Sequence, residues 1–270
     1  MHKVLYVNSE NEIIDFENLG VVMDLSGIFS HKWKEELLYE KIVGFKKKQE
    51  AIPITLFLKG TSAYQNSEFI LDVIEKDIAA VKAGTLKYGQ WYLPGYFTNK
   101  KTNGFYKCSN SIKMTLEFIT DVDKWRRENH FTYRVNDEAV EERGLGYSYG
   151  YPYDFLSSIN AQNLYNHSYT DSNFILNVYG PAINPAVTIA GSVYKVETEL
   201  LKNEYLTINT KDKTIIKTAV KGEKVNEYAN RSLDSYIFKK IPVGMNSVAV
   251  TPNCNFDIIV IEERSEPTWI

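Results

Sequence analysis

The sequence has little cysteine, no long hydrophobic run and no large excess of either charge. Its two cysteines, Cys108 and Cys254, lie too far apart in the chain for a Cys-x-x-Cys motif and cannot make a disulfide framework. We interpret both as free thiols in ordinary core positions. The N-terminal residues lack the apolar core of a signal peptide, and no apolar run is long enough to cross a membrane. We therefore expect folding in a cytoplasm, without membrane insertion.

The balance of charges argues against a nucleic-acid partner. The chain has 31 lysines and arginines, 34 aspartates and glutamates and a formal net charge of −3. Proteins that grip a phosphate backbone carry a positive field, which this composition does not supply. The short basic runs at residues 46–48 and 124–127 are flanked by acids and are interpreted as solvated loops or strand ends. We expect no sequence-specific nucleic-acid binding.

Motifs for metals, phosphates and cofactors are also missing from the sequence. Neither the cysteines nor the scattered histidines have a second ligand at zinc spacing. Gly144-x-Gly146 leads neither to a Lys-Ser/Thr pair nor to a helix, so it does not predict a phosphate loop. There is no calcium-loop pattern and no nucleophile elbow. We expect no metal, no cofactor and no catalytic residues; the histidines considered are His2, His31, His130 and His167.

The main argument for an enzyme is a group of carboxylates among tyrosines, namely Glu138, Glu141, Glu142 and Asp154. Glycosidases place two carboxyl groups roughly 5–9 Å apart across the scissile bond. A charged connector produces such a group by chance, so a solvated linker is the preferred interpretation. Convergence of these four carboxylates on a cleft would favour the enzyme.

What the chain does contain is aromatic, strand-forming sequence. Its 19 Tyr and 13 Phe favour β structure and protein interfaces. Short alternating or β-branched runs predict strands throughout the first half. These runs are Lys3–Val7, Ile13–Phe16, Gly20–Leu25, Tyr39–Phe45, Ile52–Leu58, Gly89–Phe97, Gly104–Cys108 and Ile112–Ile119.

One amphipathic helix is predicted at about residues 67–83 within this β-rich half. Asn66 or Ser67 is its expected N-cap and Gly84 its expected C-cap. Its apolar stripe consists of Phe69, Ile70, Val73, Ile74, Ile78 and Val81. Residues 1–135 are therefore predicted to form a small β-barrel with one helix.

The second half predicts a connector followed by a second β module. Residues 136–166 combine charge with tyrosines, glycines and Pro152, which is typical of an extended connector. From 167 to 262, short strands between turn signals predict a β-sandwich of the jelly-roll type. The fold class is thus mainly β. The predicted strands are Phe174–Tyr179, Val187–Ala190, Ser192–Glu199, Glu204–Asn209, Thr214–Thr218, Tyr236–Lys239, Asn246–Thr251 and Phe256–Glu262.

Several stretches of the second half, in order, resemble siphophage distal tail proteins, which also occur in prophages and tail-like particles. They are GYPYDF (150–155), GPAINP (180–185), NEYLTINT (203–210), SYIF (235–238), IPVGMN (241–246) and EERSEPTW (262–269). The resemblance is specific over Gly150–Trp269 and only architectural over the first half.

This resemblance implies a structural protein and not an enzyme. It implies a β-barrel that closes a hexameric ring, a galectin-like sandwich that faces outward, and a segment 263–270 that returns to the first module. The ring, possibly one of a stack, would join the major tail tube protein to the tail-associated lysin and the receptor-binding protein. The expected location is the virion tail tip, after assembly in the cytoplasm of a bacterial host.

The alternative is a carbohydrate-binding module that contributes to adsorption to the host cell wall. Galectins bind sugar through a His-x-Asn-x-Arg strand followed by Trp and Glu-x-Arg. Here Ser168 and Tyr169 follow His167, and Trp269 comes after Glu262 and Arg264 instead of before such a pair. The sequence therefore departs from the galectin pocket and leaves other modes of sugar binding open.

Overall fold

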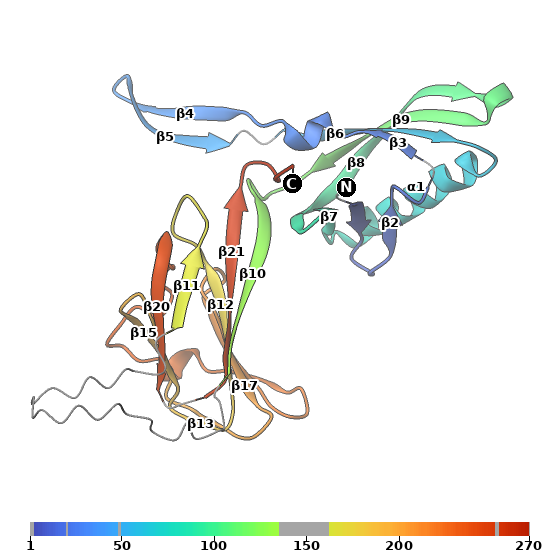
Figure 1. Cartoon of the computed structure of the whole chain (residues 1–270). Helices are drawn as coiled ribbons and strands as arrows, with labels where there is room; N and C mark the ends of the chain where they lie inside the picture. The colour runs from blue at the N-terminus through green and yellow to red at the C-terminus, as the bar shows by residue number, and fades with distance from the viewer. Residues whose placement is uncertain (1–2, 20, 48–49, 135–161, 252–253, 270) are drawn as a thin grey trace, which may run out of the picture. The chain divides into compact units, whose positions relative to one another are not determined.

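The computed structural model describes residues 3–19, 21–47, 50–134, 162–251 and 254–269 (Figure 1). The chain divides into two compact units. Unit 1 comprises Met1–Arg127 together with Glu263–Ile270, and unit 2 comprises Glu128–Glu262. The chain passes between the units within two strands, β10 (Trp125–Tyr133) and β21 (Phe256–Arg264).

Unit 1 is built on an antiparallel sheet with the order β2-β1-β7-β8-β9-β6-β3. Alternate residues of its strands are buried, as β6 shows with Ile54 and Leu56, because successive side chains of a strand point to opposite faces. The strands are β1 (Val4–Val7), β2 (Ile13–Asp15), β3 (Val21–Asp24), β6 (Ile52–Lys59), β7 (Gly84–Tyr88), β8 (Trp91–Tyr106) and β9 (Ser111–Ile119).

One α-helix, α1 (Ala63–Ala80), occurs in the described residues, and Ile70, Val73 and Ile74 of its predicted apolar stripe pack into the core of unit 1. The prediction is wrong for Phe69, Ile78 and Val81, whose side chains are exposed. The predicted span of about 67–83 is wrong at both ends. The helix starts earlier because Ala63 is itself buried in the core, and it ends where Val81 adopts a left-handed conformation with φ 52°. Gly84 does not cap the helix but begins β7, where Tyr6 and Asp77 leave no room for a Cβ atom.

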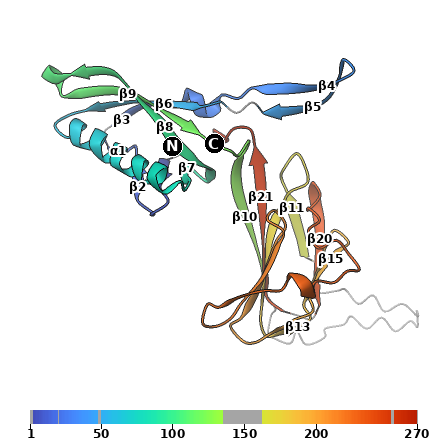
Figure 2. The same cartoon turned by 180° about the vertical axis from the view of Figure 1, so that it is seen from behind.

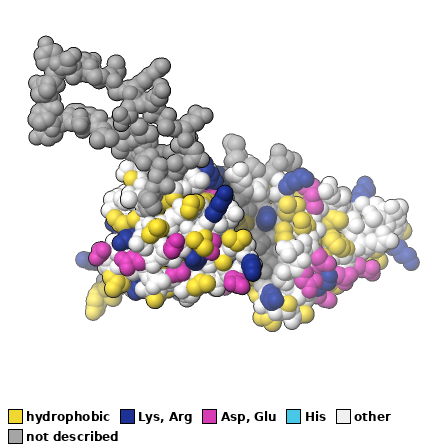
Figure 3. Space-filling view, turned by 90° about the horizontal axis from the view of Figure 1, so that it is seen from below, with side chains coloured by type: hydrophobic (Ala, Val, Ile, Leu, Met, Phe, Trp, Pro, Cys, Tyr) yellow, Lys and Arg dark blue, Asp and Glu magenta, His cyan; other side chains and the backbone are white. Residues whose placement is uncertain are grey.

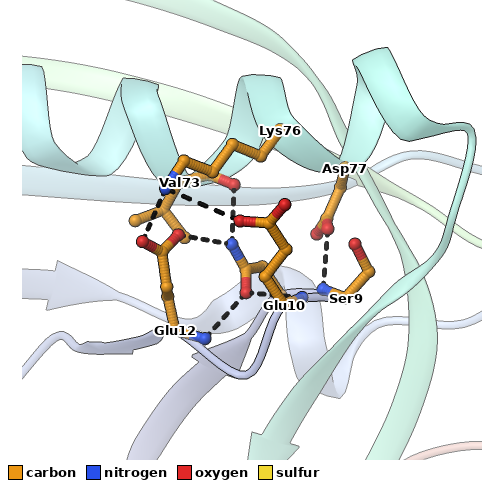
Figure 4. A network of polar contacts seen from close by, with 7 residues as sticks. Ser9, Glu10, Glu12, Val73, Lys76 and Asp77 are labelled. Atoms are coloured by element: carbon orange, nitrogen blue, oxygen red, sulfur yellow. Dashed lines mark hydrogen bonds and ion pairs between the residues drawn. The ribbon is translucent and has the colours of Figure 1, made fainter.

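Polar contacts fix α1 to the turn between β1 and β2 (Figure 4). The buried Asp77 carboxylate accepts hydrogen bonds from the Tyr6 hydroxyl and, at 2.7 Å, from the Ser9 amide. Burial beside this carboxylate raises the pKa of Tyr6 above its usual value. Lys76 lies 2.5 Å from Glu12 and closes the solvent-facing side of the network. The helix is thus held to the sheet by polar contacts as well as by the buried side chains of Ile70, Val73 and Ile74.

A separate hairpin in unit 1 consists of β4 (Trp33–Leu38) and β5 (Lys41–Lys47). Its turn residues Tyr39 and Glu40 both have positive φ, at 48° and 65°, as in the tight turns that match the twist of a hairpin. The hairpin extends as an arm away from the sheet and helix of unit 1 (Figures 1 and 2). The 3-10 helix η1 (Ser26–Phe29) precedes it.

Unit 2 is a β-sandwich. One sheet has the order β19-β18-β17-β12-β21-β10 and the other β11-β20-β14-β15. Buried side chains of both sheets, such as Leu176 and Val187, belong to one core. The strands besides β10 and β21 are β11 (Gln162–Asn166), β12 (Phe174–Tyr179), β13 (Ala182–Ile183), β14 (Ala186–Ile189), β15 (Ser192–Lys195), β16 (Glu199–Leu200), β17 (Tyr205–Asn209), β18 (Thr214–Thr218), β19 (Lys224–Asn226) and β20 (Gly244–Thr251).

The prediction of a mainly β fold with one helix and a C-terminal sandwich is confirmed, whereas three local predictions in unit 2 are wrong. Ser192–Glu199 was expected as one strand, but β15 ends at Lys195 and β16 begins at Glu199 and pairs in another sheet. Residues 162–166 were expected in the connector but form β11, because Leu164 and Asn166 are buried in the sandwich. Tyr236–Lys239 was expected as a strand but forms a turn with a hydrogen bond from Lys239 N to Tyr236 O. The remainder of the predicted connector, residues 136–161, lies outside the described residues.

Candidate assembly surface

The register of the β4–β5 hairpin gathers apolar side chains on one face, which also carries Glu35. Glu35 pairs with Phe45 and Leu37 pairs with Ile42, and paired residues place their side chains on the same side of a hairpin. A register shift between Glu36 and Leu37 adds a bulge on the opposite strand. Leu37, Ile42 and Phe45 therefore lie along one face, with exposed fractions of 60%, 58% and 60%.

The other face of the hairpin is charged. Lys34 pairs with Lys46, and Leu38 pairs with Lys41. The ammonium of Lys46 forms an ion pair with Glu36 across the strands. The hairpin is thus amphipathic, although neither face packs on the sheet of unit 1. Because an isolated hairpin is marginally stable in water, and uncovered apolar patches mark interaction sites, this arm is the candidate assembly surface.

The root of the arm is anchored by the segment Glu263–Ile270, which belongs to unit 1. Lys47 at the end of β5 donates a hydrogen bond of 3.0 Å to the Ser265 carbonyl, and burial lowers the pKa of its ammonium. His31, just before β4, lies 3.3 Å from the Glu266 carboxylate. Both ends of the hairpin are therefore fixed while its apolar face stays in solvent.

Further contacts hold the same segment to the sheet of unit 1. The Trp91 indole donates a hydrogen bond of 3.1 Å to the Thr268 hydroxyl. Arg126 pairs with Glu263 at 3.3 Å. A cavity of about 620 Å³ lies at the root of the arm and is lined by side chains of both signs, among them Lys47 and Asp123. Its mixed lining gives no preference for an anion or a cation.

The residues considered as metal ligands do not come together. His31 contacts Glu266, His130 lies 3.6 Å from Glu128, and the His167 ring packs on Tyr165. Among the residues that the structure describes, no group of three or more His, Cys, Asp or Glu side chains is placed to hold a metal ion. None of the described helices is long and apolar enough to span a membrane.

The two cysteines lie in different surroundings. Cys254 is buried in the core of unit 2, where burial raises the pKa of its thiol to about 11. Cys108 is exposed in the 3-10 helix η2 (Lys107–Ser109), so the prediction that it is a core residue is wrong. Its position follows from the turn that joins β8 to β9, which carries its side chains away from the core.

The remaining candidate residues for catalysis or sugar binding either lie outside the described part of the chain or make structural contacts within their own unit. His2, Gly144, Gly146 and the four carboxylates Glu138, Glu141, Glu142 and Asp154 lie outside the described residues. The buried Glu262 accepts a hydrogen bond from Asn129, and Trp269 packs on Phe29 in unit 1. Figure 3 shows one face of the molecule, on which positive and negative side chains are interspersed.

Sequence reasoning did not predict the first strand of the arm. Trp33–Leu38 combines three charged residues with apolar ones and was not predicted as a strand. The alternation of Glu35 and Leu37 with Lys34 and Glu36 becomes informative only once its partner strand is known.

Comparison with known proteins found similar folds among solved structures. No family model matches the sequence, and no curated protein matches it. A chain of the phage P2 baseplate in its activated conformation with Ca aligns with a TM-score of 0.64 and 14% identity over 98% of this chain and 99% of that one. The corresponding structure with Sr gives a TM-score of 0.62 and 13% identity, over 99% of this chain and 100% of that chain.

A second phage supplies a similar structure. The SPP1 Dit protein, described as a paradigm of the hub adsorption apparatus of phages that infect Gram-positive bacteria, aligns with a TM-score of 0.58 and 8% identity. That alignment covers 98% of this chain and 99% of that chain. Over both units, the protein has the fold of phage baseplate and Dit hub proteins, which confirms at the level of fold the resemblance to siphophage distal tail proteins.

Proposed function

We propose that this protein is a structural component of a phage tail tip, where it forms a homohexameric ring that joins the tail tube to the receptor-binding apparatus. Structural similarity to baseplate and Dit hub proteins over 98% of the chain supports the location and the role. The observation that carries the assembly is the uncovered apolar face of the β4–β5 arm, formed by Leu37, Ile42 and Phe45. No step of this role requires catalysis.

A ring provides a cover for that face on every subunit. In a head-to-tail contact with a closing rotation, each arm packs on its neighbour and no arm remains unpaired. Burying the exposed parts of the three side chains would contribute about 3–5 kcal/mol per interface before the cost of association. The anchored root of the arm limits this cost, because Lys47 and His31 already hold both strands in place.

The partners proposed for the ring are the major tail tube protein on one side and the tail-associated lysin and receptor-binding protein on the other. Such a hub acts by presenting the same surface at six equivalent positions. Stacking of two rings is compatible with the same surfaces. The virion tail tip is the corresponding location, after assembly in the bacterial cytoplasm.

The oligomeric state tests the ring. Native mass spectrometry and light scattering of the full chain should detect a particle of six 31.0 kDa subunits, alone or once the tube and tip proteins are added. The variant L37S/I42S/F45S should shift this particle to monomer. Leu38→Ser is the matched control, because Leu38 is 57% exposed on the opposite, charged face of the same arm.

Two results would contradict the proposal. One is a chain that stays monomeric at micromolar concentration even in the presence of the tube and tip proteins. The other is a hexamer that the triple variant and Leu38→Ser leave equally intact, which would place the interface elsewhere.

The second candidate function is saccharide binding during adsorption to the host. It is favoured by a specific observation in unit 2, where Tyr228, Tyr236 and Phe238 surround a small open pocket.

A further inference from the structure

The pocket is formed by a loop of unit 2 that follows the 3-10 helix η3 (Tyr228–Asn230) and leads to β20. Although it has no regular strand, the loop is fixed at several points. Arg231 forms a β-bridge with Val196, and the Tyr194 hydroxyl donates a hydrogen bond of 2.8 Å to the Lys239 carbonyl. Ile237 is buried in the sandwich core. The loop therefore presents its remaining side chains from a preformed support.

Three aromatic rings line this support. Phe238 is buried, and its ring lies nearly parallel to Tyr228 at 5.9 Å and edge-on to Tyr236 at 6.0 Å. Tyr236 is 61% exposed and Tyr228 is 40% exposed. Ile237 and Phe238 anchor the loop in the core, whereas the exposed tyrosine rings offer an apolar face with a polar tip.

Polar groups stand beside the rings. The Arg231 guanidinium lies 4.1 Å from the centre of the Tyr228 ring and donates to the Tyr228 carbonyl at 2.7 Å, which leaves further N–H groups for a ligand. The Ser232 hydroxyl donates to Asp234 and the Ser235 hydroxyl to the Val193 carbonyl. The Ser232 oxygen also accepts from the Asp234 amide at 3.3 Å, and each serine oxygen keeps at least one lone pair that can accept a further hydrogen bond.

The size of the pocket distinguishes between classes of ligand. Its volume is about 300 Å³, near the lower end of the roughly 300–1,000 Å³ found for small-molecule sites. A protein partner would contact about 20–30 residues over about 800 Å², whereas eight residues line this pocket. A pyranose ring suits the pocket, since it combines an apolar C–H face with a rim of hydroxyl groups.

We propose that this pocket is a saccharide-binding site. One sugar ring packs its C–H face on Tyr236, Arg231 donates to its hydroxyl oxygens, and the oxygens of Ser232 and Ser235 accept from its hydroxyl groups. The site deepens the second candidate function and does not depend on the hexameric ring, because all its residues lie in unit 2. It differs from a galectin pocket, since neither His167 nor Trp269 takes part.

The full chain should be applied to an array of purified oligosaccharides built from hexose, deoxyhexose and N-acetylhexosamine units. The best-bound oligosaccharide is then titrated by isothermal calorimetry. Tyr236→Ala should weaken its binding about tenfold or more, which is a loss that the calorimeter resolves easily. Tyr236→Phe should retain most of the affinity, because the ring face remains.

Tyr165→Ala is the matched control, since Tyr165 is a 47% exposed tyrosine of the same unit outside the pocket. It should bind the sugar like the unchanged protein. Circular dichroism of each variant confirms that the fold is intact. Failure of every oligosaccharide to bind, or equal losses for Tyr236→Ala and Tyr165→Ala, would overturn the proposal without bearing on the oligomeric state.

Discussion

Trp269 stacks on Phe29 in unit 1, with ring centroids 3.8 Å apart and ring planes at 14°. Phe29 ends η1, the short helix that precedes the β4–β5 arm. The stack therefore joins the segment Glu263–Ile270 to the root of the arm, in addition to the contact between Lys47 and Ser265. This arrangement makes the C-terminal segment a support for the proposed assembly surface.

Removing this stack should loosen the root of the arm. We expect Trp269→Ala to cost about 0.5–1.5 kcal/mol, the range for an aromatic pair, because Trp269 remains largely exposed. Hydrogen exchange followed by mass spectrometry should show faster exchange in η1 and at the start of β4. Leu233→Ala, at an 83% exposed position in unit 2, is the control. Unchanged exchange in η1 would show that the stack does not support the arm.

The buried Asp77 should be important for the stability of unit 1. Asp77→Ala leaves the Tyr6 hydroxyl buried without its acceptor, at a cost of about 1–3 kcal/mol. Because the two side chains form one interaction, the double variant Tyr6→Phe/Asp77→Ala should lose less than the sum of the single variants. Urea unfolding followed by circular dichroism measures all three, with the exposed Asp72→Ala as a control. Strict additivity would contradict the coupling.

Glu204 should give unit 2 a stability that depends on pH. The Leu201 amide at 2.9 Å and the Lys217 ammonium at 3.0 Å lower the pKa of its carboxyl from its usual value. Because the folded-state pKa is lower than the unfolded one, the stabilisation is complete above the unfolded pKa and disappears as the pH falls through the folded pKa.

Glu204→Gln should therefore be less stable than the unchanged protein at neutral pH. The difference between their thermal midpoints should shrink as the pH is lowered to about 3. Glu223→Gln, at an exposed position, should follow the unchanged protein throughout. A difference that stays constant with pH would mean that the carboxylate charge does not stabilise the fold.

Gly27 in η1 should tolerate no side chain. A Cβ atom built on it would lie 2.3 Å from the Pro53 carbonyl oxygen and 2.8 Å from the Pro53 ring, so the backbone must move. We expect Gly27→Ala to lower the free energy of unfolding by about 1–3 kcal/mol. Gly44→Ala is the control, because a Cβ there would meet only the end of the Glu36 side chain, at 3.1 Å. Equal stability of the two variants in urea would refute the close approach.

Sequence reasoning succeeded where local pattern and burial coincide. Alternation predicted strands such as Ile112–Ile119, which the structure has as β9 at Ser111–Ile119. It failed where contacts with residues far away in the sequence determine the local backbone conformation. The alternating run at Tyr236–Lys239 satisfies a strand pattern, but its backbone makes a turn because Ile237 and Phe238 enter the core together. The start of α1 was missed because nothing local indicates that Ala63 is buried.

By itself, the sequence determined a mainly β chain with one helix, and its second half pointed to the fold shared with Dit hub proteins. Only the tertiary structure decided which apolar residues are covered. Phe45 lies in a predicted strand much as Phe118 does, yet Phe118 is fully buried while Phe45 is 60% exposed. The reason is physical: a strand pattern fixes which side chains share a face, but burial of that face depends on neighbours that the fold brings from elsewhere in the chain.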